Sequence, residues 1–340
     1  MSLRIGFWFG ILLISVFAAH WGAERLSSPL KKLRRQWGLT AVAGGTFIGL
    51  AAASPEIAIN TVSALRDVGS IGLGNSFGAN VLSMPLMVTA AYLAVRTTDV
   101  TQQRGEDSKA AASQNPTDSP EQLPVRRTAV TVLAIPYILI LVLVAVLTLP
   151  APWRGLQPLD GWLLAIAYLI YAGQALVRGR QEGENVQWTR KEVGLAVAGV
   201  IVLAVGSYFA IRATEQLVAA FGISEIVGGL FITGTMSTLP ELFATWSIVK
   251  SGQFTSGTTG VVTDNAVTMT VALVPLAFVT VPIDDFQLYW VSFAFLVAMP
   301  LLYTVFIYWS PEQSGFSLWQ VIAFDLSYLV FLGVIIAVIF

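Results

Sequence analysis

Two glutamates in long apolar stretches of the chain each follow a proline directly, and each precedes an asparagine by the same distance. The two copies are Pro55-Glu56 with Asn80 and Pro240-Glu241 with Asn265. In both copies the asparagine lies 24 residues after the glutamate. A proline and an ionised carboxylate are both unfavourable in a membrane helix, so their paired appearance indicates a site rather than a scaffold. Carboxylate oxygens bind hard cations, and cation binding is the chemistry that this pattern predicts.

Each proline also shapes the backbone beside its glutamate. Proline lacks a backbone N–H and clashes with the preceding turn, so we expect the helices to break or kink at Pro55 and Pro240. Such a break leaves carbonyl oxygens without intrahelical partners, and these oxygens can line a cation site. Small residues before each proline, among them Gly49 and Gly234, allow neighbouring helices to approach closely.

The elements that must hold these residues are membrane helices. The chain has 340 residues, of which 55% are hydrophobic and 11% charged, and its mean hydropathy of +0.72 is too high for a soluble domain of this size. The absence of cysteine excludes disulfides, thiolate metal sites and cysteine catalysis. The sequence contains no glycine-rich phosphate loop with lysine and no histidine pair for zinc, so we expect no enzymatic activity, no cofactor and no nucleic acid partner.

A window of about 20 residues, the length that crosses the hydrocarbon layer, predicts ten spans, five in each half of the chain. We place them near residues 4–23, 37–65, 71–96, 127–149, 158–177, 191–211, 222–249, 255–281, 286–309 and 317–340. Residues 97–126 are too polar to fold alone and are predicted to be a disordered loop. The predicted domains are residues 1–96 with spans 1–3, the 97–126 loop, residues 127–177 with spans 4–5, a linker at 178–190, and residues 191–340 with spans 6–10.

The distribution of lysine and arginine predicts the orientation of these spans. If the loops alternate between the two faces of the membrane, one face collects fifteen of these residues and the other keeps four. The positive-inside rule then places both termini outside, and the 97–126 loop and the 178–190 linker in the cytoplasm of a cell-membrane protein. A five-span unit repeated after an odd number of crossings must be inverted, so the predicted fold is all-α, with ten transmembrane helices in two inverted five-helix repeats.

An internal repeat supports this inversion. Residues 44–84 align without gaps on residues 229–269 at a constant offset of 185. The alignment matches Gly49 with Gly234, Pro55 with Pro240, Glu56 with Glu241, Asn80 with Asn265, Ser83 with Thr268 and Met84 with Met269.

These motifs resemble the two alpha-repeats of the cation/calcium exchanger superfamily, which includes the sodium/calcium exchangers. The family motif reads roughly Gly-Thr-Ser-x-Pro-Glu, followed in the next helix by Gly-Asn and by Gly-Ser-Asn-x-x-Asn/Asp. The first copy here reads Ala51-Ala52-Ala53-Ser54-Pro55-Glu56, then Gly74-Asn75 and Gly78-Ala79-Asn80-Val81-Leu82-Ser83. The second reads Met236-Ser237-Thr238-Leu239-Pro240-Glu241, then Thr259-Gly260 and Thr263-Asp264-Asn265-Ala266-Val267-Thr268. The resemblance covers essentially the whole chain and implies an ion exchanger.

Several ligand positions depart from the family motif. The hydroxyl pair of the first repeat is replaced by Ala52 and Ala53, whereas the second repeat keeps Ser237 and Thr238. The final Asn/Asp position of each motif corresponds to a hydroxyl residue, Ser83 in the first repeat and Thr268 in the second.

A carboxylate appears one helical turn before one of these hydroxyls. Asp264 lies four residues before Thr268 and shares its helix face, while the first-repeat counterpart of Asp264 is Ala79. We infer that the third carboxylate of the site has moved by one turn and still faces the cavity.

The predicted metal site therefore contains three carboxylates and several neutral oxygens. The carboxylates are Glu56, Glu241 and Asp264, and the hydroxyls are Ser83, Ser237, Thr238 and Thr268. Asn75, Asn80 and Asn265 are further candidate ligands, although bridging of broken backbone is the favoured role of Asn80 and Asn265. Calcium takes six to eight oxygen ligands, and this set is adequate for it. Three carboxylates in the membrane cannot all stay ionised without a cation, so competition with protons is also open.

The expected function is secondary antiport of Ca²⁺ against Na⁺ or H⁺ by alternating access at a site near the middle of the bilayer. The alternatives are a monovalent cation/proton exchanger (Na⁺/H⁺ or K⁺/H⁺) and a transport-inactive membrane scaffold or sensor. Asp325, about eight residues into span 10, lies either on the ion path or in a polar crevice. The sequence indicates neither the oligomeric state nor the stoichiometry.

Overall fold

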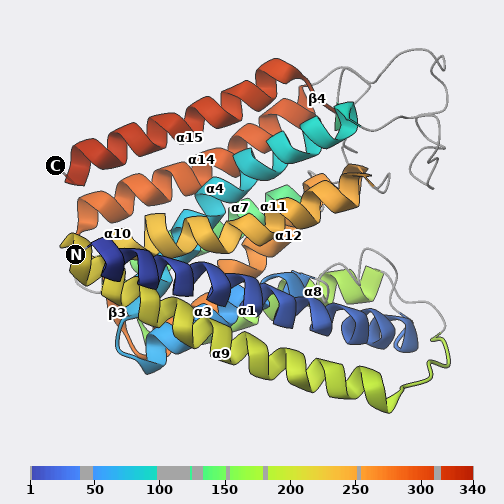
Figure 1. The fold of residues 1–340 in the computed structure, drawn as a ribbon. Coiled ribbons are helices and arrows are strands. Elements are labelled where there is room, and N and C mark those ends of the chain that lie inside the picture. Colours follow the sequence, from blue (N-terminus) through green and yellow to red (C-terminus); the bar gives the residue numbers. More distant parts are fainter. Residues whose placement is uncertain are drawn as a thin grey trace. The chain divides into compact units, whose positions relative to one another are not determined.

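The computed structural model describes residues 2–38, 49–97, 123–124, 133–150, 154–178, 183–250, 254–309 and 315–339. Its regular structure consists of helices and four two-residue strands (Figure 1). The elements up to the middle of the chain are α1 (Ser2–Gln36), α3 (Ser54–Leu65), α4 (Gly69–Arg96), β1 (Leu123–Pro124), α7 (Ile135–Thr148), β2 (Gly155–Leu156) and α8 (Pro158–Arg178). They are followed by α9 (Arg190–Phe221), α10 (Glu225–Gly228), η2 (Gly229–Thr233), α11 (Gly234–Lys250), α12 (Phe254–Thr268), η3 (Val271–Leu273), α13 (Val274–Phe278), β3 (Val281–Pro282), α14 (Phe286–Tyr308), β4 (Gly315–Phe316) and α15 (Leu318–Ile339).

Seven helical segments in the described residues are long and apolar enough to cross a membrane. They are Leu3–Leu30, Gly69–Arg96, Arg190–Phe221, Glu225–Lys250, Gly260–Phe278, Phe286–Tyr308 and Leu318–Ile339. Two shorter apolar helices cover Ile135–Thr148 and Pro158–Gly173. The protein is therefore an all-helical, multi-pass membrane protein.

Two helices extend well beyond the predicted spans. The span predicted near residues 4–23 is part of α1, which has 35 residues and ends at Gln36, and the span predicted near 191–211 is part of α9, which ends at Phe221. Hydropathy detects only the apolar part of a helix, whereas lysine, arginine and leucine continue the helical backbone of α1 into its basic segment. The polar end of α1 is held by the linker before α9, because Trp188 Nε1 donates a hydrogen bond of 3.0 Å to Gln36 Oε1.

Most of the predicted disordered loop lies outside the described residues. Within the 97–126 range, the structure describes Thr97 and the two residues of β1. β1 pairs antiparallel with β4, with Leu123 opposite Phe316 and Pro124 opposite Gly315. The end of this loop therefore contains a short stretch of ordered backbone.

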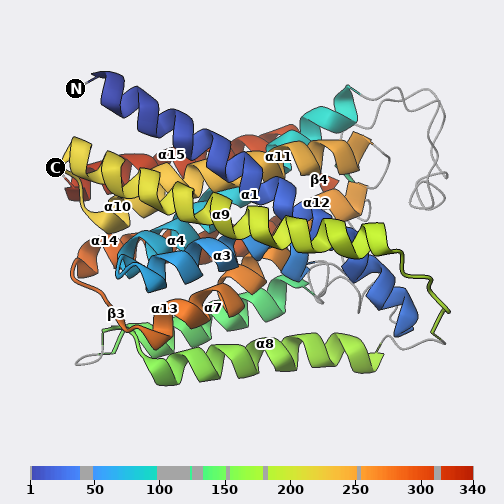
Figure 2. The same ribbon diagram turned by 60° about the horizontal axis from the view of Figure 1, so that its bottom comes forward.

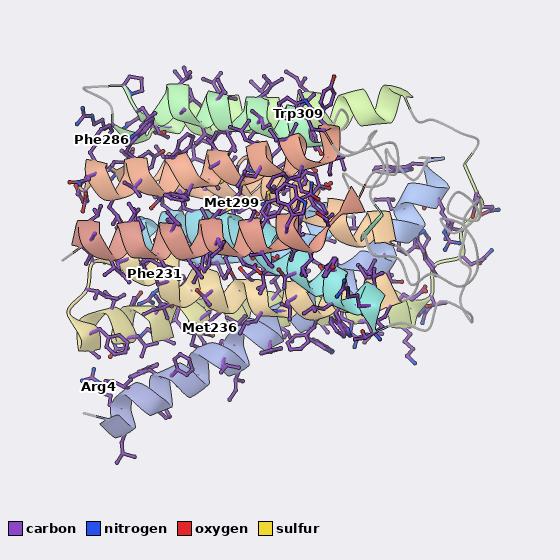
Figure 3. The ribbon with its side chains drawn as sticks, turned by 90° about the horizontal axis from the view of Figure 1, so that it is seen from above. Arg4, Phe231, Met236, Phe286, Met299 and Trp309 are labelled. Atoms are coloured by element: carbon purple, nitrogen blue, oxygen red, sulfur yellow. The ribbon has the colours of Figure 1, made fainter. Side chains whose placement is uncertain are left out.

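The chain divides into two compact units, and each unit takes segments from both sequence halves. The first unit comprises residues 1–79, 142–237 and 263–283, and the second comprises residues 80–141, 238–262 and 284–340. In the first unit, α13 packs against α8, as Figure 2 shows. In the second unit, α14 packs against α15, and Figure 3 labels Phe286, the first residue of α14, and Trp309, which directly follows its last residue.

Small residues let α1 and α9 of the first unit lie against each other along their length. A Cβ atom added at Gly22 would lie 2.5 Å from the carbonyl oxygen of Gly199, and one at Gly206 would lie 2.7 Å from that of Ser15. Such close backbone approach is the usual way in which membrane helices gain packing contacts. A cluster of buried side chains completes this interface, namely Leu12, Val16, Ala210, Ala213 and Leu217.

The same kind of contact joins α4 to the backbone just before α11. A Cβ atom at Gly78 would lie 2.0 Å from the carbonyl oxygen of Leu230, and one at Gly229 would lie 2.1 Å from that of Ile71. The first half of α4 therefore lies directly against the π-helix η2. This contact fixes the position of Asn75 in the first unit.

Each unit also contains a short β ladder of the same composition. In the first unit, β2 pairs antiparallel with β3, with Gly155 opposite Pro282 and Leu156 opposite Val281. In each ladder, one strand consists of an apolar residue and a proline (β1 and β3). The other strand consists of a glycine and an apolar residue (β4 and β2). The ladders extend the internal similarity beyond the aligned repeat of residues 44–84 and 229–269.

Candidate cation site

Glu56 is positioned by the start of helix α3. The helix begins at Ser54 after a turn at Ala53, and Pro55 occupies its first turn, where the missing N–H has no consequence. The predicted break at Pro55 is confirmed. Glu56 lies in the same first turn, where the unpaired N–H groups of the helix favour a negative charge.

The structure shows no break at Pro240. Helix α11 continues from Gly234 through Pro240 to Lys250, and the irregular backbone lies upstream in the five-residue π-helix Gly229–Thr233. A π-turn adds one residue to the helical repeat, so it accommodates the backbone irregularity about two turns before the proline. The two Pro-Glu motifs therefore stand in different backbone settings.

Glu56 and Asp264 form a buried carboxylate pair in the first unit. A carboxylate oxygen of Glu56 and one of Asp264 lie within 4.8 Å of each other. Glu56 is 1% exposed and Asp264 is 7% exposed. Both oxygens of Glu56 and the Oδ1 atom of Asp264 have no hydrogen-bond partner among the described residues. Buried carboxylates of this kind are costly unless a cation or a proton neutralises them, so the pair fits a cation.

Neutral oxygens accompany this pair in the first unit. Thr268 lies one turn after Asp264 on α12, and its buried Oγ1 has no hydrogen-bond partner among the described residues. Ser237 donates hydrogen bonds of 3.3 Å to Asn75 Oδ1 and 3.1 Å to the carbonyl oxygen of Gly234. Asn265 is also buried. Five of the nine predicted site residues thus belong to the first unit, namely Glu56, Ser237, Asp264, Asn265 and Thr268.

The other four predicted site residues belong to the second unit. They are Asn80, Ser83, Thr238 and Glu241. Tyr137 of α7 donates a 3.2 Å hydrogen bond to Asn80 Oδ1, and Ser83 donates one of 3.2 Å to the carbonyl oxygen of Asn80. Asn80 thus links α4 to α7 through its side chain. Its bridging of broken backbone stays a prediction. Participation of these four residues in the same cation site stays a prediction.

Ala53, which replaces a hydroxyl residue of the family motif, lies in a cluster of buried hydrophobic residues. Ala53 is fully buried and packs with Tyr168 and Val267. The alanine side chain offers no cation ligand, so at this position the first repeat can contribute only a backbone oxygen. Where the family motif has a hydroxyl residue, this chain therefore has Ala53, and its side chain packs into the protein core.

Asn60 is a buried polar residue near the site that the sequence motifs do not include. This side chain follows Glu56 by one turn on α3, is fully buried, and donates to Ser76 Oγ and to the carbonyl oxygen of Ala272, both at 2.8 Å. Ser63, one turn further along, is fully buried too. The signal in the sequence was the spacing of Glu56, Asn60 and Ser63, because polar residues at i, i+4 and i+7 share one helix face.

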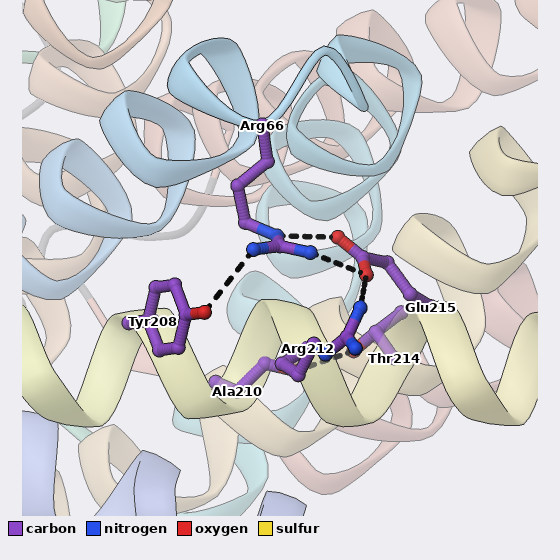
Figure 4. Close-up of polar contacts among 6 residues, drawn as sticks. All are labelled: Arg66, Tyr208, Ala210, Arg212, Thr214 and Glu215. Carbon is purple, nitrogen blue, oxygen red and sulfur yellow. Dashed lines mark hydrogen bonds and ion pairs between the residues drawn. The ribbon is translucent and has the colours of Figure 1, made fainter.

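A charged network lies at the far end of α3 (Figure 4). Arg66 follows the last residue of the helix, and its Nε and Nη2 donate to the two carboxylate oxygens of Glu215 at 2.6 and 2.9 Å. Arg212 donates to the same carboxylate at 3.1 Å, and Tyr208 accepts a bond of 3.3 Å from Arg66. The hydrogen bonds with Glu215 raise the pKa of Arg66 above its ordinary value. The network connects the helix that carries Glu56 to α9.

A multi-pass helical protein with buried, unpaired carboxylates in its helices has the features of a membrane ion transporter. The sequence profile of the sodium/calcium exchanger protein family matches residues 7–177 and 191–337. The chain belongs to this family, whose members are transporters. The resemblance inferred from the two repeats is therefore confirmed.

Solved structures of a sodium-calcium exchanger, NCX_Mj, have the same fold. The structure soaked with 10 mM Na⁺ and zero Ca²⁺ is 19% identical, with a TM-score of 0.61 over 98% of this chain and 99% of that chain. The structure soaked with 100 mM Na⁺ and 10 mM Sr²⁺ is 20% identical, with a TM-score of 0.58 over 98% and 99% of the two chains. No curated protein sequence gives a significant match.

Proposed function

We propose that the protein is a secondary antiporter that exchanges Ca²⁺ for Na⁺ or H⁺ by alternating access. The observation that carries this proposal is the Glu56–Asp264 pair, whose buried oxygens have no hydrogen-bond partners among the described residues. Hard divalent cations bind through several oxygens with strong negative charge, and two adjacent carboxylates supply that charge. Membership of a transporter family supports transport, rather than catalysis, as the use of this site.

The proposed architecture has ten spans in two inverted five-helix repeats, with both termini outside and the 97–126 loop in the cytoplasm of the cell membrane. The gap-free repeat at an offset of 185 and the unequal distribution of lysine and arginine support it. The matching composition of the two β ladders adds support from outside the aligned repeat.

The proposed ligands combine both repeats. Glu56, Asp264 and Thr268 supply oxygens whose burial fits a cation. The pairing of Glu241 with Glu56 in the repeat suggests that Glu241 is the third carboxylate. The remaining proposed ligands are Ser83, Ser237, Thr238, Asn80 and Asn265.

The carboxylates also explain how the two ion fluxes are coupled. Buried carboxylates without a cation carry a desolvation cost of several kcal/mol per ion. The protein therefore switches the site from one face of the membrane to the other only when Ca²⁺ or the competing ions are bound. This requirement makes the outward movement of one ion depend on the inward movement of the other.

A monovalent cation/proton exchanger is the second candidate. The observation that favours it is the apolar cluster around Ala53, which removes a hydroxyl position of the family motif from the ligand set. A smaller set of oxygens suits an ion of lower charge, since calcium takes at least six. A transport-inactive scaffold is the third candidate.

Flux measurements in reconstituted vesicles separate these candidates. We expect Ca²⁺ uptake when Na⁺ or H⁺ is trapped inside, and we expect Glu56→Gln to abolish it because the variant removes a buried charge. Asp285→Asn is the matched control, because Asp285 caps α14 at the surface through Oδ1 and asparagine retains that acceptor. Na⁺/H⁺ or K⁺/H⁺ exchange without Ca²⁺ uptake would select the second candidate. Absence of flux in all gradients, with the fold intact, would leave only the scaffold.

A further inference from the structure

A buried amide connects the elements that carry the first-unit part of the cation site. Asn60 lies on α3 and is fully buried. Its Nδ2 group donates to Ser76 Oγ and to the carbonyl oxygen of Ala272, each at 2.8 Å. A side-chain amide has two N–H donors, so these two bonds use its whole donor capacity.

Two of the three elements joined in this way carry a polar residue of the site region, and the third follows a helix that does. Helix α3 carries Glu56 one turn before Asn60. Helix α4 carries Asn75 directly before Ser76. The acceptor Ala272 belongs to η3, which follows α12 with Asp264 and Thr268.

The backbone near Ala272 needs such a partner because the helix is interrupted there. Helix α12 ends at Thr268, and Thr270 adopts φ −125° and ψ −85°, which is not helical. The following short helix α13 contains Pro275 in its first turn, and proline has no N–H to donate. Carbonyl groups at a helix interruption inside the membrane must find partners outside the helix.

The repeat shows that this arrangement is specific to one half of the chain. The offset of 185 places Thr245 at the position of Asn60 in the second repeat. Thr245 donates to Met87 Sδ at 3.1 Å within the second unit. Helix α4 continues without interruption from Gly69 to Arg96, so the first repeat has no break like the one after α12. An amide is therefore required only at Asn60.

Space for the amide is provided by glycine. A Cβ atom at Gly72 would lie 3.1 Å from Asn60 Oδ1, 3.0 Å from Ser63 Cβ and 2.9 Å from Leu276 Cδ2. The close approach of α4 at Gly72 thus holds Asn60 between α4 and the segment after α12. Two buried hydrogen bonds and this packing restrict the side chain to one position.

We infer that Asn60 is a positioning residue that fixes the spacing between the Glu56 and Asp264 carboxylates and thereby sets the ionic radius that the site prefers. This inference rests on the proposed function. Ca²⁺ binds oxygens at 2.3–2.6 Å, so a change in ligand spacing of a few tenths of an ångström alters the preference between Ca²⁺ and the larger Sr²⁺.

The test measures KM and maximal rate for Ca²⁺ and Sr²⁺ uptake in vesicles that contain the full chain. Asn60→Leu preserves the size of the side chain and removes both hydrogen bonds. We expect it to raise the KM for Ca²⁺ by about tenfold, since the net value of two hydrogen bonds corresponds to roughly that factor. The KM for Sr²⁺ is expected to rise less, so that the ratio of the two values shifts toward Sr²⁺. Thr245→Val is the matched control and is expected to leave this ratio unchanged.

A second variant covers the case in which Asn60→Leu fails to fold. Ser76→Ala removes one acceptor and keeps the bond to Ala272, so we expect the same shift of the KM ratio at smaller size. An unchanged ratio in Ser76→Ala, or a lower maximal rate with unchanged KM values in Asn60→Leu, would show a merely structural role and overturn the inference. A wild-type chain without Ca²⁺ flux would instead refute the proposed function, and the positioning role would fall with it.

Discussion

Glu56 and Asp264 bring carboxylate oxygens within 4.8 Å of each other, although one residue comes from each repeat. The two residues do not occupy equivalent repeat positions, because Glu241 is the counterpart of Glu56 and Ala79 that of Asp264. The pair therefore makes the proposed site asymmetric. Glu56 has a carboxylate counterpart in the other repeat, whereas Asp264 does not.

The position of Asp264 can be tested by moving its carboxylate. We expect Asp264→Asn to reduce Ca²⁺ uptake in vesicles to the background of Glu56→Gln, because each variant removes one buried charge. The double variant Asp264→Ser with Thr268→Asp returns the carboxylate to the family position one turn later and should recover part of the uptake. Full uptake by Asp264→Asn would refute a relocated carboxylate while leaving exchange intact.

Close backbone contact between α4 and η2 predicts a strongly destabilising substitution. A Cβ atom at Gly78 would lie 2.0 Å from the carbonyl oxygen of Leu230, which cannot move without its helix. We expect Gly78→Ala to lower the free energy of unfolding by about 2 kcal/mol or more, as overpacking does. Thermal unfolding in detergent measures the effect.

Gly194→Ala on α9 is the control for that experiment, because a Cβ atom there would meet no atom of another described segment within 4 Å. We expect its melting temperature to equal or exceed that of the wild type, since alanine favours the helix. Equal melting temperatures for the two variants would contradict the close contact at Gly78.

The bidentate ion pair between Arg66 and Glu215 should contribute to stability. The side chains of Arg66 and Glu215 are only 23% and 15% exposed, so we expect Arg66→Met to cost about 1–2 kcal/mol after allowance for screening by solvent. Arg212 still pairs with Glu215 at 3.1 Å in this variant, which limits the loss. Arg4→Met is the control, because the bond from Arg4 to Gln216 is exposed and involves a neutral acceptor.

The pH dependence of this contribution follows from the pKa of Arg66. Glu215 raises that pKa, so the guanidinium stays charged, and its stabilising effect is lost only as the pH rises through the higher folded-state pKa. We therefore expect the stability difference between wild type and Arg66→Met to be constant from neutral pH to about pH 10. A difference that disappears within this range would show that the guanidinium charge is not its source.

Asp325 is expected to be dispensable for exchange. Thr89 Oγ1 lies 3.0 and 3.1 Å from the two oxygens of Asp325 and donates to them, and both side chains are half-buried in the second unit. Asparagine keeps an acceptor for this bond, so we expect Asp325→Asn to change the KM for Ca²⁺ by less than about twofold. Loss of uptake in this variant would place Asp325 on the ion path.

Local backbone chemistry explains which helix boundaries could be predicted. Pro55 lies in the first turn of α3, where proline is tolerated because the missing N–H has no intrahelical partner, so the start of this helix could be predicted. Pro240 lies inside α11, since the π-helix upstream takes up the irregularity. Similarly, α1 continues to Gln36 because hydropathy ends a span where the polar residues begin, whereas the backbone needs only helix-forming residues to continue.

The sequence alone determined the membrane class, the repeated Pro-Glu motifs and the family of this protein, because these features depend on composition and on spacing along the chain. The tertiary structure decided which side chains meet: that Asp264 lies beside Glu56, and that Asn60 holds α3, α4 and η3 together. Such contacts depend on the rotation of each helix about its axis and on how closely its backbone approaches its neighbours. Gly72 and Gly78 allow α4 to approach segments that are distant in the sequence, because they have no side chain.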